Sequence, residues 1–323
     1  MKKIWILVIL LQFSFCNISW SAPVEKLLSP QWWINATTSD LESELQKKAD
    51  VNMRNEQGLT PLIIASIKNN NPAVIEKLIQ YGASVNARTN EGLTALMGAS
   101  GATTNPEVIK ILLKHGANLE TMDREGATAL MYAIAENENS EILKTLIQAG
   151  AKSNVKDSKG QIPIFIAAAY AKNPQIIDII IAGGASVNQV DEQGTSVLMH
   201  AVSQNSHMEI VKKLLLLGAD INYTNKEKET VLMMAAAYAK NPQIVELLIA
   251  KGADINAQNA KGETALMVAC QYNPLTDIIK TLLIKGADAK IKDKNGKNAL
   301  DYARENISIY QTTVYQRLKN ATK

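Results

Sequence analysis

The chain has 323 residues, of which 46% are hydrophobic and 20% charged, and its formal net charge at pH 7 is +3. These fractions are ordinary for a folded protein and exclude extensive disorder, a collagen-like repeat and a long coiled coil. The two cysteines and three histidines exclude a disulfide-rich scaffold and leave little material for a metal centre or a histidine-based catalytic site.

The first residues have the features of a secretory signal peptide. Two lysines precede an apolar run over residues 4–15, which as a helix would span about 18 Å, too short for a hydrocarbon core of about 30 Å. Small residues ending at Ser21 predict cleavage before Ala22, so we expect residues 1–21 to be removed. Two alternatives are a buried N-terminal helix and a lipoprotein acylated at Cys16, although the bulky residues before Cys16 disfavour the second.

Removal of this segment changes the charge and the cysteine content. Loss of Lys2 and Lys3 lowers the net charge from +3 to +1, which disfavours a general binder of nucleic acids or anionic membranes. Cys270 becomes the only cysteine, so we expect no disulfide and a buried thiol. No later segment approaches membrane-spanning length, so we expect no stable membrane insertion of the mature chain.

Residues 22–57 are predicted to cap the N-terminal end of the fold. Ser39 to Glu42 has the pattern of a helix capping box. Trp32 and Trp33, the only tryptophans after residue 21, are expected to cover the first repeat.

From Gly58 onward two motifs recur together every 34 residues. A glycine followed by a Thr-Ala-Leu-like stretch begins each unit, at positions 58, 92, 126, 160, 194, 262 and 296, with Lys228 in place of glycine in one unit. A Gly-Ala pair keeps the same spacing at Gly82, Gly116, Gly150, Gly184, Gly218, Gly252 and Gly286. Two motifs in phase over so many units indicate a repeat protein.

Each unit predicts two helices and a hairpin. The threonine caps the first helix, and an alanine three residues after the leucine indicates a close neighbouring helix. Asparagine followed by proline, as at Asn71-Pro72 and Asn241-Pro242, begins the second helix. The glycine of Gly-Ala ends it, and polar turn-forming residues follow.

This pattern resembles the ankyrin repeat over nearly all of the chain after residue 22. The resemblance implies an all-α helical solenoid of helix–turn–helix–hairpin units, which we expect to form one stack with polar end caps. The predicted repeats are 58–91, 92–125, 126–159, 160–193, 194–227, 228–261 and 262–295, followed by a C-terminal capping repeat at 296–323.

The chain departs from the family pattern in two ways. Its repeat has 34 residues rather than about 33. The histidine that usually follows Thr-Pro-Leu is replaced by Met97, Met131, Met199, Met233 and Met267, with Ile63 and Phe165 in the other two repeats. We expect these methionines to fill the core rather than to bind a soft metal.

No pattern of residues indicates an enzyme. The sequence contains no phosphate-binding glycine loop, nucleophile elbow, zincin motif or paired cysteines. His115, His200 and His207 occupy different positions of their repeats, so we do not expect them to share a site. We therefore expect a non-catalytic protein with no catalytic residues, no metal and no cofactor.

The resemblance to ankyrin repeats implies a concave binding groove formed by hairpin tips and first helices. One outward position of the first helix carries Tyr170, Gln204, Tyr238 and Tyr272, and nearby hairpin tips carry Glu192, Lys226, Glu227 and Lys261. Tyrosine is a frequent anchor of protein interfaces. Alternatively, the tyrosines only cover the turn between helices, and Tyr170 and Tyr238 lie in a duplicated string, Ala-Ala-Ala-Tyr-Ala-Lys-Asn-Pro.

These features predict a protein-protein interaction scaffold, monomeric and exported to the bacterial envelope, most simply the periplasm. Its partner would be a protein or peptide, not a nucleic acid. The alternative is a secreted effector that binds target proteins of another organism. The lysine-rich stretch 285–297 is either a solvated hairpin or a docking patch.

Overall fold

The structure is a computed structural model of the 323-residue chain, and it describes residues 23–204 and 207–322. The predicted signal peptide, its cleavage site before Ala22 and the alternative lipid attachment at Cys16 lie outside the described residues.

The described part of the chain is helical and contains two isolated β-bridges but no strand, which confirms the all-α prediction. One 3₁₀ helix, η1 (Pro23–Leu28), precedes the α-helices. The α-helices are α2 (Pro30–Trp33), α3 (Thr38–Gln46), α4 (Pro61–Lys68), α5 (Pro72–Gln80), α6 (Ala95–Ala102), α7 (Pro106–Lys114), α8 (Ala129–Glu136), α9 (Ser140–Gln148), α10 (Pro163–Tyr170), α11 (Gln175–Ala182), α12 (Val197–Gln204), α13 (Met208–Leu216), α14 (Val231–Tyr238), α15 (Pro242–Ala250), α16 (Ala265–Tyr272), α17 (Thr276–Ile284), α18 (Ala299–Glu305) and α19 (Thr313–Ala321).

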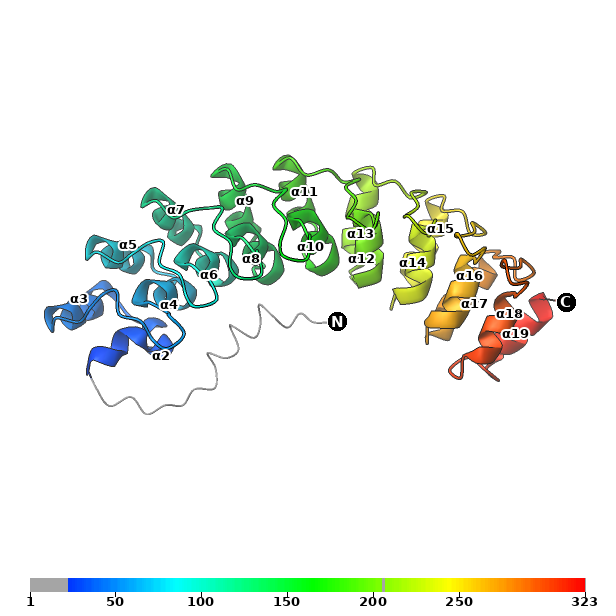
Figure 1. The fold of residues 1–323 in the computed structure, drawn as a ribbon, viewed down its shortest axis with the longest axis horizontal. Helices are drawn as coiled ribbons and strands as arrows, with labels where there is room; N and C mark the ends of the chain where they lie inside the picture. Colours follow the sequence, from blue (N-terminus) through cyan, green and yellow to red (C-terminus); the bar gives the residue numbers. More distant parts are fainter. Residues whose placement is uncertain (1–22, 205–206, 323) are drawn as a thin grey trace. The chain divides into compact units, whose positions relative to one another are not determined.

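The chain forms two compact units. Of the described residues, the first unit takes in those up to Ile166 together with Asp178–Gly184, and the second takes in Ala167–Ile177 together with those from Ala185 onward. In the first unit α4, α6 and α8 pack side by side, and α5, α7 and α9 form a second row against them (Figure 1). The second unit repeats this arrangement with α12, α14, α16 and α18 in one row and α13, α15, α17 and α19 in the other.

Local signals define the helix ends as the sequence predicts. The Thr94 hydroxyl accepts a hydrogen bond from the backbone N–H of Met97 (3.2 Å) at the start of α6. The Asn71 side chain accepts from the N–H of Ala73 (3.1 Å) at the start of α5, where Pro72 needs no amide partner. Gly82 follows that helix with φ +91°, in the left-handed region that glycine tolerates.

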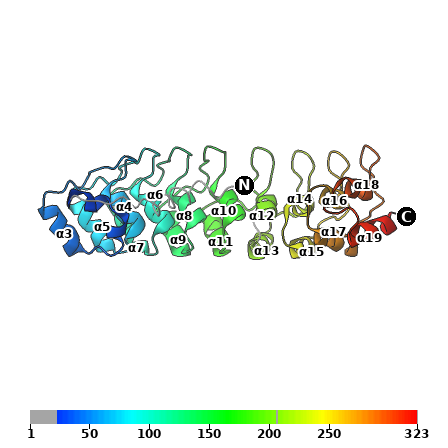
Figure 2. The same cartoon turned by 90° about the horizontal axis from the view of Figure 1, so that it is seen from below.

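The core of each unit consists of the side chains that recur at one helical phase. The alanine three residues after the motif leucine is buried in every repeat, and in the second unit these are Ala167, Ala201, Ala235, Ala269 and Ala303. The five methionines that replace the usual histidine are also buried, as expected of core side chains. Within each unit taken by itself, the hairpins project to one side of the helices (Figure 2).

The N-terminal cap differs from the prediction in one detail. The capping box of α3 is formed by Thr37 and Asp40, not by Ser39 and Glu42: the Thr37 N–H donates to Asp40 (2.9 Å) and the Asp40 N–H donates to the Thr37 hydroxyl (3.2 Å). The reason is that Thr37 is the last residue with extended backbone, so Ser39 already lies inside the helix. Trp33 is buried as expected, with its indole N–H donating to the Leu27 carbonyl (2.8 Å).

Candidate functional site

Hydrogen bonds join the hairpin tips of the second unit to one another. The N–H of Ala260 donates to the Glu227 carbonyl (2.9 Å), and the N–H of Lys294 donates to the Lys261 carbonyl (3.0 Å). The Lys226 ammonium donates to the Glu192 carbonyl (2.5 Å). The sequence analysis proposed four hairpin residues, and all are exposed: Glu192, Lys226, Glu227 and Lys261. The hydrogen bonds between neighbouring hairpins hold the backbone of these residues in place.

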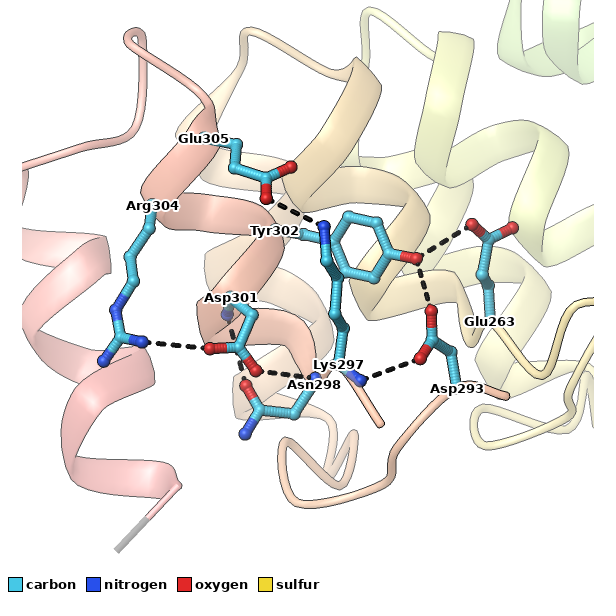
Figure 3. Close-up of polar contacts among 8 residues, drawn as sticks. All are labelled: Glu263, Asp293, Lys297, Asn298, Asp301, Tyr302, Arg304 and Glu305. Carbon is cyan, nitrogen blue, oxygen red and sulfur yellow. Dashed lines mark hydrogen bonds and ion pairs between the residues drawn. The ribbon is translucent and has the colours of Figure 1, made fainter. Parts of the chain in front are cut away.

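In some hairpins an aspartate at the base contacts a side chain of the helix that follows. In one hairpin an oxygen of Asp191 accepts from the N–H of Thr195 (2.7 Å), while its other oxygen lies 2.9 Å from Nε2 of His200 on α12. In the last hairpin the Asp293 carboxylate accepts from the hydroxyl of Tyr302 on α18 (2.7 Å; Figure 3). The sequence analysis missed these pairs, although their constant separation of nine residues was a usable signal.

Tyr238 and Tyr272 are the last residues of α14 and α16, two helices that pack against each other. The side-chain amide of Asn273 donates to the carbonyls of Ala236 (3.0 Å) and Ala239 (3.2 Å), which holds the turn after α16 against the turn after α14. Tyr238 is 55% exposed and Tyr272 is 53% exposed, so about half of each residue's surface is accessible to a partner.

The exposed apolar surface continues beyond the tyrosines named from the sequence. Leu275 follows Tyr272 in the same turn and is 40% exposed. The next turn is held by Asn306, whose amide donates to the Cys270 carbonyl (2.9 Å). It carries Ile307, which is 94% exposed, and Tyr310, which is 48% exposed. We name these five residues the turn strip: Tyr238, Tyr272, Leu275, Ile307 and Tyr310.

The turn strip is nearly free of charge. Lys240 is the only charged residue in the turns 238–240, 271–275 and 306–310. Exposed apolar side chains that gather in successive turns are typical of a protein-binding site. The sequence analysis did not include Ile307 and Tyr310 because they belong to the capping repeat, where no repeat phase identified them.

Tyr170 and Gln204 occupy the same helix-end position in earlier repeats of the second unit. Tyr170 is half-buried, whereas Gln204 is exposed. The partial burial of Tyr170 is consistent with a covering role for this side chain, so the turn strip at the C-terminal end is the stronger candidate.

The titratable side chains do not gather into a reaction centre in the described residues. His200 pairs with Asp191, while His115 lies 3.7 Å from a carboxylate oxygen of Glu76 in the other unit. Burial raises the pKa of the Cys270 thiol far above its ordinary value, so it stays protonated and unreactive. Within the described residues no group of His, Cys, Asp and Glu is arranged to hold a metal ion.

Over residues 23–204 and 207–322, every helix is too short or too polar to cross a bilayer.

Comparison with known proteins identifies the repeat. The family model for ankyrin repeats (three copies) matches five overlapping segments: residues 35–123, 68–157, 130–225, 164–259 and 232–314. The crystal structure of the human ASB11 ankyrin repeat domain is similar, with a TM-score of 0.61 and 26% sequence identity over 70% of this chain and 98% of that chain. No curated protein matches the sequence.

Proposed function

Because the chain belongs to the ankyrin-repeat family, whose members generally mediate protein–protein interaction, we propose that it is a non-catalytic scaffold of the bacterial envelope. In this proposal it is exported, and it holds a protein or peptide against the turn strip and the neighbouring hairpin tips of its second unit. The observation that carries the proposal is the turn strip itself.

The exposed side chains of the turn strip are suited to anchoring a partner. Tyrosine buries a large area on binding and keeps a hydroxyl for hydrogen bonding, with little loss of rotamer freedom. Ile307 is almost fully exposed, so burying its side chain against a partner contributes roughly 1.5–3 kcal/mol of favourable free energy to binding. The hydrogen bonds of Asn273 and Asn306 hold the turns in place, which lowers the entropic cost of association.

Export is supported by the sequence of the first 21 residues and by the cysteine content. The lysines and short apolar run have the form of a bacterial signal peptide. A single buried cysteine after residue 21 suits an oxidising compartment, since it forms no disulfide within the chain.

The binding surface is tested by replacing three tyrosines of the turn strip, Tyr238, Tyr272 and Tyr310, with alanine together. The protein and this variant are used to capture partners from envelope extract, and their thermal unfolding is compared. The proposal expects lost capture with an unchanged fold. The control is Tyr81→Ala, which removes an equally exposed tyrosine from the first unit. Unchanged capture by the triple variant would contradict the binding role, and a collapsed fold would favour the turn-covering role.

Export is tested separately by cell fractionation with an antibody to the protein. The proposal expects the processed chain in the envelope fraction. Its presence in the culture medium would favour the alternative, a secreted effector, and its presence in the cytoplasm would contradict both.

A further inference from the structure

The hairpin between α17 and α18 presents a row of lysines. Lys290, Lys292 and Lys294 are exposed, whereas Ala289 and Asp293 between and beside them are buried. The residues between these lysines are half-buried Ile291 and buried Asp293, so the three lysine side chains lie on the exposed face of the hairpin. Lys261, at the tip of the preceding hairpin, stands beside them because its carbonyl accepts from the N–H of Lys294 (3.0 Å). We name these four residues the lysine edge.

Two carboxylates close to the lysine edge, Glu263 and Asp293, are buried. Asp293 uses one oxygen for the N–H groups of Asn295 (2.9 Å) and Lys297 (2.8 Å), and the other for the Tyr302 hydroxyl (2.7 Å). Glu263 accepts from Asn259 (2.8 Å) and lies 3.1 Å from the same hydroxyl. Figure 3 shows Glu263 and Asp293 directed at the hydroxyl of Tyr302.

The hydrogen bonds of the Asp293 carboxyl group favour its ionised form. Burial alone would raise its pKa, but the hydrogen bonds from Tyr302 and from the backbone at Lys297 and Asn295 outweigh it, so the pKa lies below its usual value. At neutral pH the Asp293 carboxylate is therefore ionised, and its oxygens accept hydrogen bonds within the protein.

The remaining charges nearby leave the lysine edge unneutralised. Lys297 pairs with Glu305 (2.8 Å), and Asp288 accepts from the backbone N–H of Lys290 (2.8 Å) rather than from its ammonium. Among the described residues, none of the four lysines of the edge makes a side-chain ion pair. The hairpin therefore has internal negative charge and external positive charge.

We propose that the lysine edge binds an acidic segment of the partner protein, a peptide rich in aspartate or glutamate. This rests on the proposed function, since it gives the chemistry of one part of the partner. An acidic protein segment fits better than nucleic acid because the edge has no aromatic side chain for base stacking and no arginine for bidentate phosphate contact. It fits better than a membrane because the same unit displays the turn strip, a surface typical of protein interfaces.

The test uses a fluorescein-labelled peptide of about 15 glutamates as probe and the protein purified in its natural processed form. Fluorescence anisotropy is measured for the protein, for the variant Lys290→Gln/Lys292→Gln/Lys294→Gln, and for a control, Lys152→Gln/Lys156→Gln/Lys159→Gln. The control removes the same charge from a hairpin of the first unit. Exposed ion pairs each contribute about two- to threefold, so the first variant is expected to bind about tenfold more weakly and the control to change less than twofold. Binding should also weaken as salt is raised.

Equal binding by the protein and the lysine-edge variant would overturn the proposal. So would binding to phosphatidylglycerol vesicles or to a DNA duplex with no binding to polyglutamate. The tyrosine variant described above separates the two proposals, since it is expected to lose partner capture while keeping polyglutamate binding. If it keeps both, the turn strip is wrong and the lysine edge stands.

Discussion

Asn273 is the residue whose removal tests most directly how neighbouring repeats are held together. Its side chain is 2% exposed and makes three hydrogen bonds: two from its amide to the carbonyls of Ala236 and Ala239, and one to its oxygen from the N–H of Leu275 (2.9 Å). Asn273→Ala leaves these backbone groups without partners. At about 1 kcal/mol for each bond, with an added penalty for the buried orphan groups, we expect a loss of about 2–4 kcal/mol in the free energy of opening this region.

Cys270 provides the assay because it is buried on α16, three residues before Asn273. In a Cys16→Ala background it is the only thiol, and its labelling rate by a maleimide follows the population of the locally opened state. A loss of 2 kcal/mol raises that population about 30-fold, so labelling should accelerate by at least that factor. Gln271→Ala is the matched control, since Gln271 is an exposed residue of the same helix, and it should change the rate little. Labelling of Asn273→Ala within twofold of the parent would refute the reasoning.

Three further predictions concern stability of the second unit. Lys228 has φ +58° where other repeats have glycine, so Lys228→Gly should stabilise the protein by roughly 0.5–1 kcal/mol in urea unfolding, whereas a loss of stability would contradict left-handed backbone strain. Ala235→Leu overpacks a buried contact between helices and should cost about 1–3 kcal/mol, with unfolding that is no longer two-state; a single transition at the parent temperature would argue against close packing there. The Asp293 pKa is lowered on folding, so its contribution is present above the unfolded pKa of about 3.9 and is lost as pH falls through the folded value. Asp293→Asn should therefore be less stable at pH 7 and lose less stability on acidification, and parallel pH profiles of the two proteins would exclude this role.

The repeat and its helices could be predicted from the sequence because their signals are local. Threonine and asparagine caps act on amides two or three residues away, and glycine or proline at a helix end acts on its own backbone. The same signals were less decisive at the N-terminal cap, where Thr37 and Ser39 are both capable of capping and only the backbone of Thr37 is extended. The tyrosines at 238 and 272 could be named from their repeat phase, but their exposure could not.

The candidate surfaces depended on contacts between distant residues. Ile307 and Tyr310 belong to the turn strip because Asn306 holds their turn to the carbonyl of Cys270, 36 residues earlier in the chain. Glu263 and Tyr302 are 39 residues apart in the chain, and the hydrogen bond from the Tyr302 hydroxyl holds the Glu263 carboxylate inside the protein.

The amino-acid sequence alone thus determined the 34-residue period, the family and the start and end signals of the repeat helices, because each depends on short-range hydrogen bonding and on the spacing of apolar residues. Only the tertiary structure decided which polar side chains are buried in hydrogen bonds and which are exposed to solvent. The physical reason is that a carboxylate or an aromatic ring has no fixed burial of its own: its environment is supplied by the neighbouring repeat, about 34 residues away in the chain.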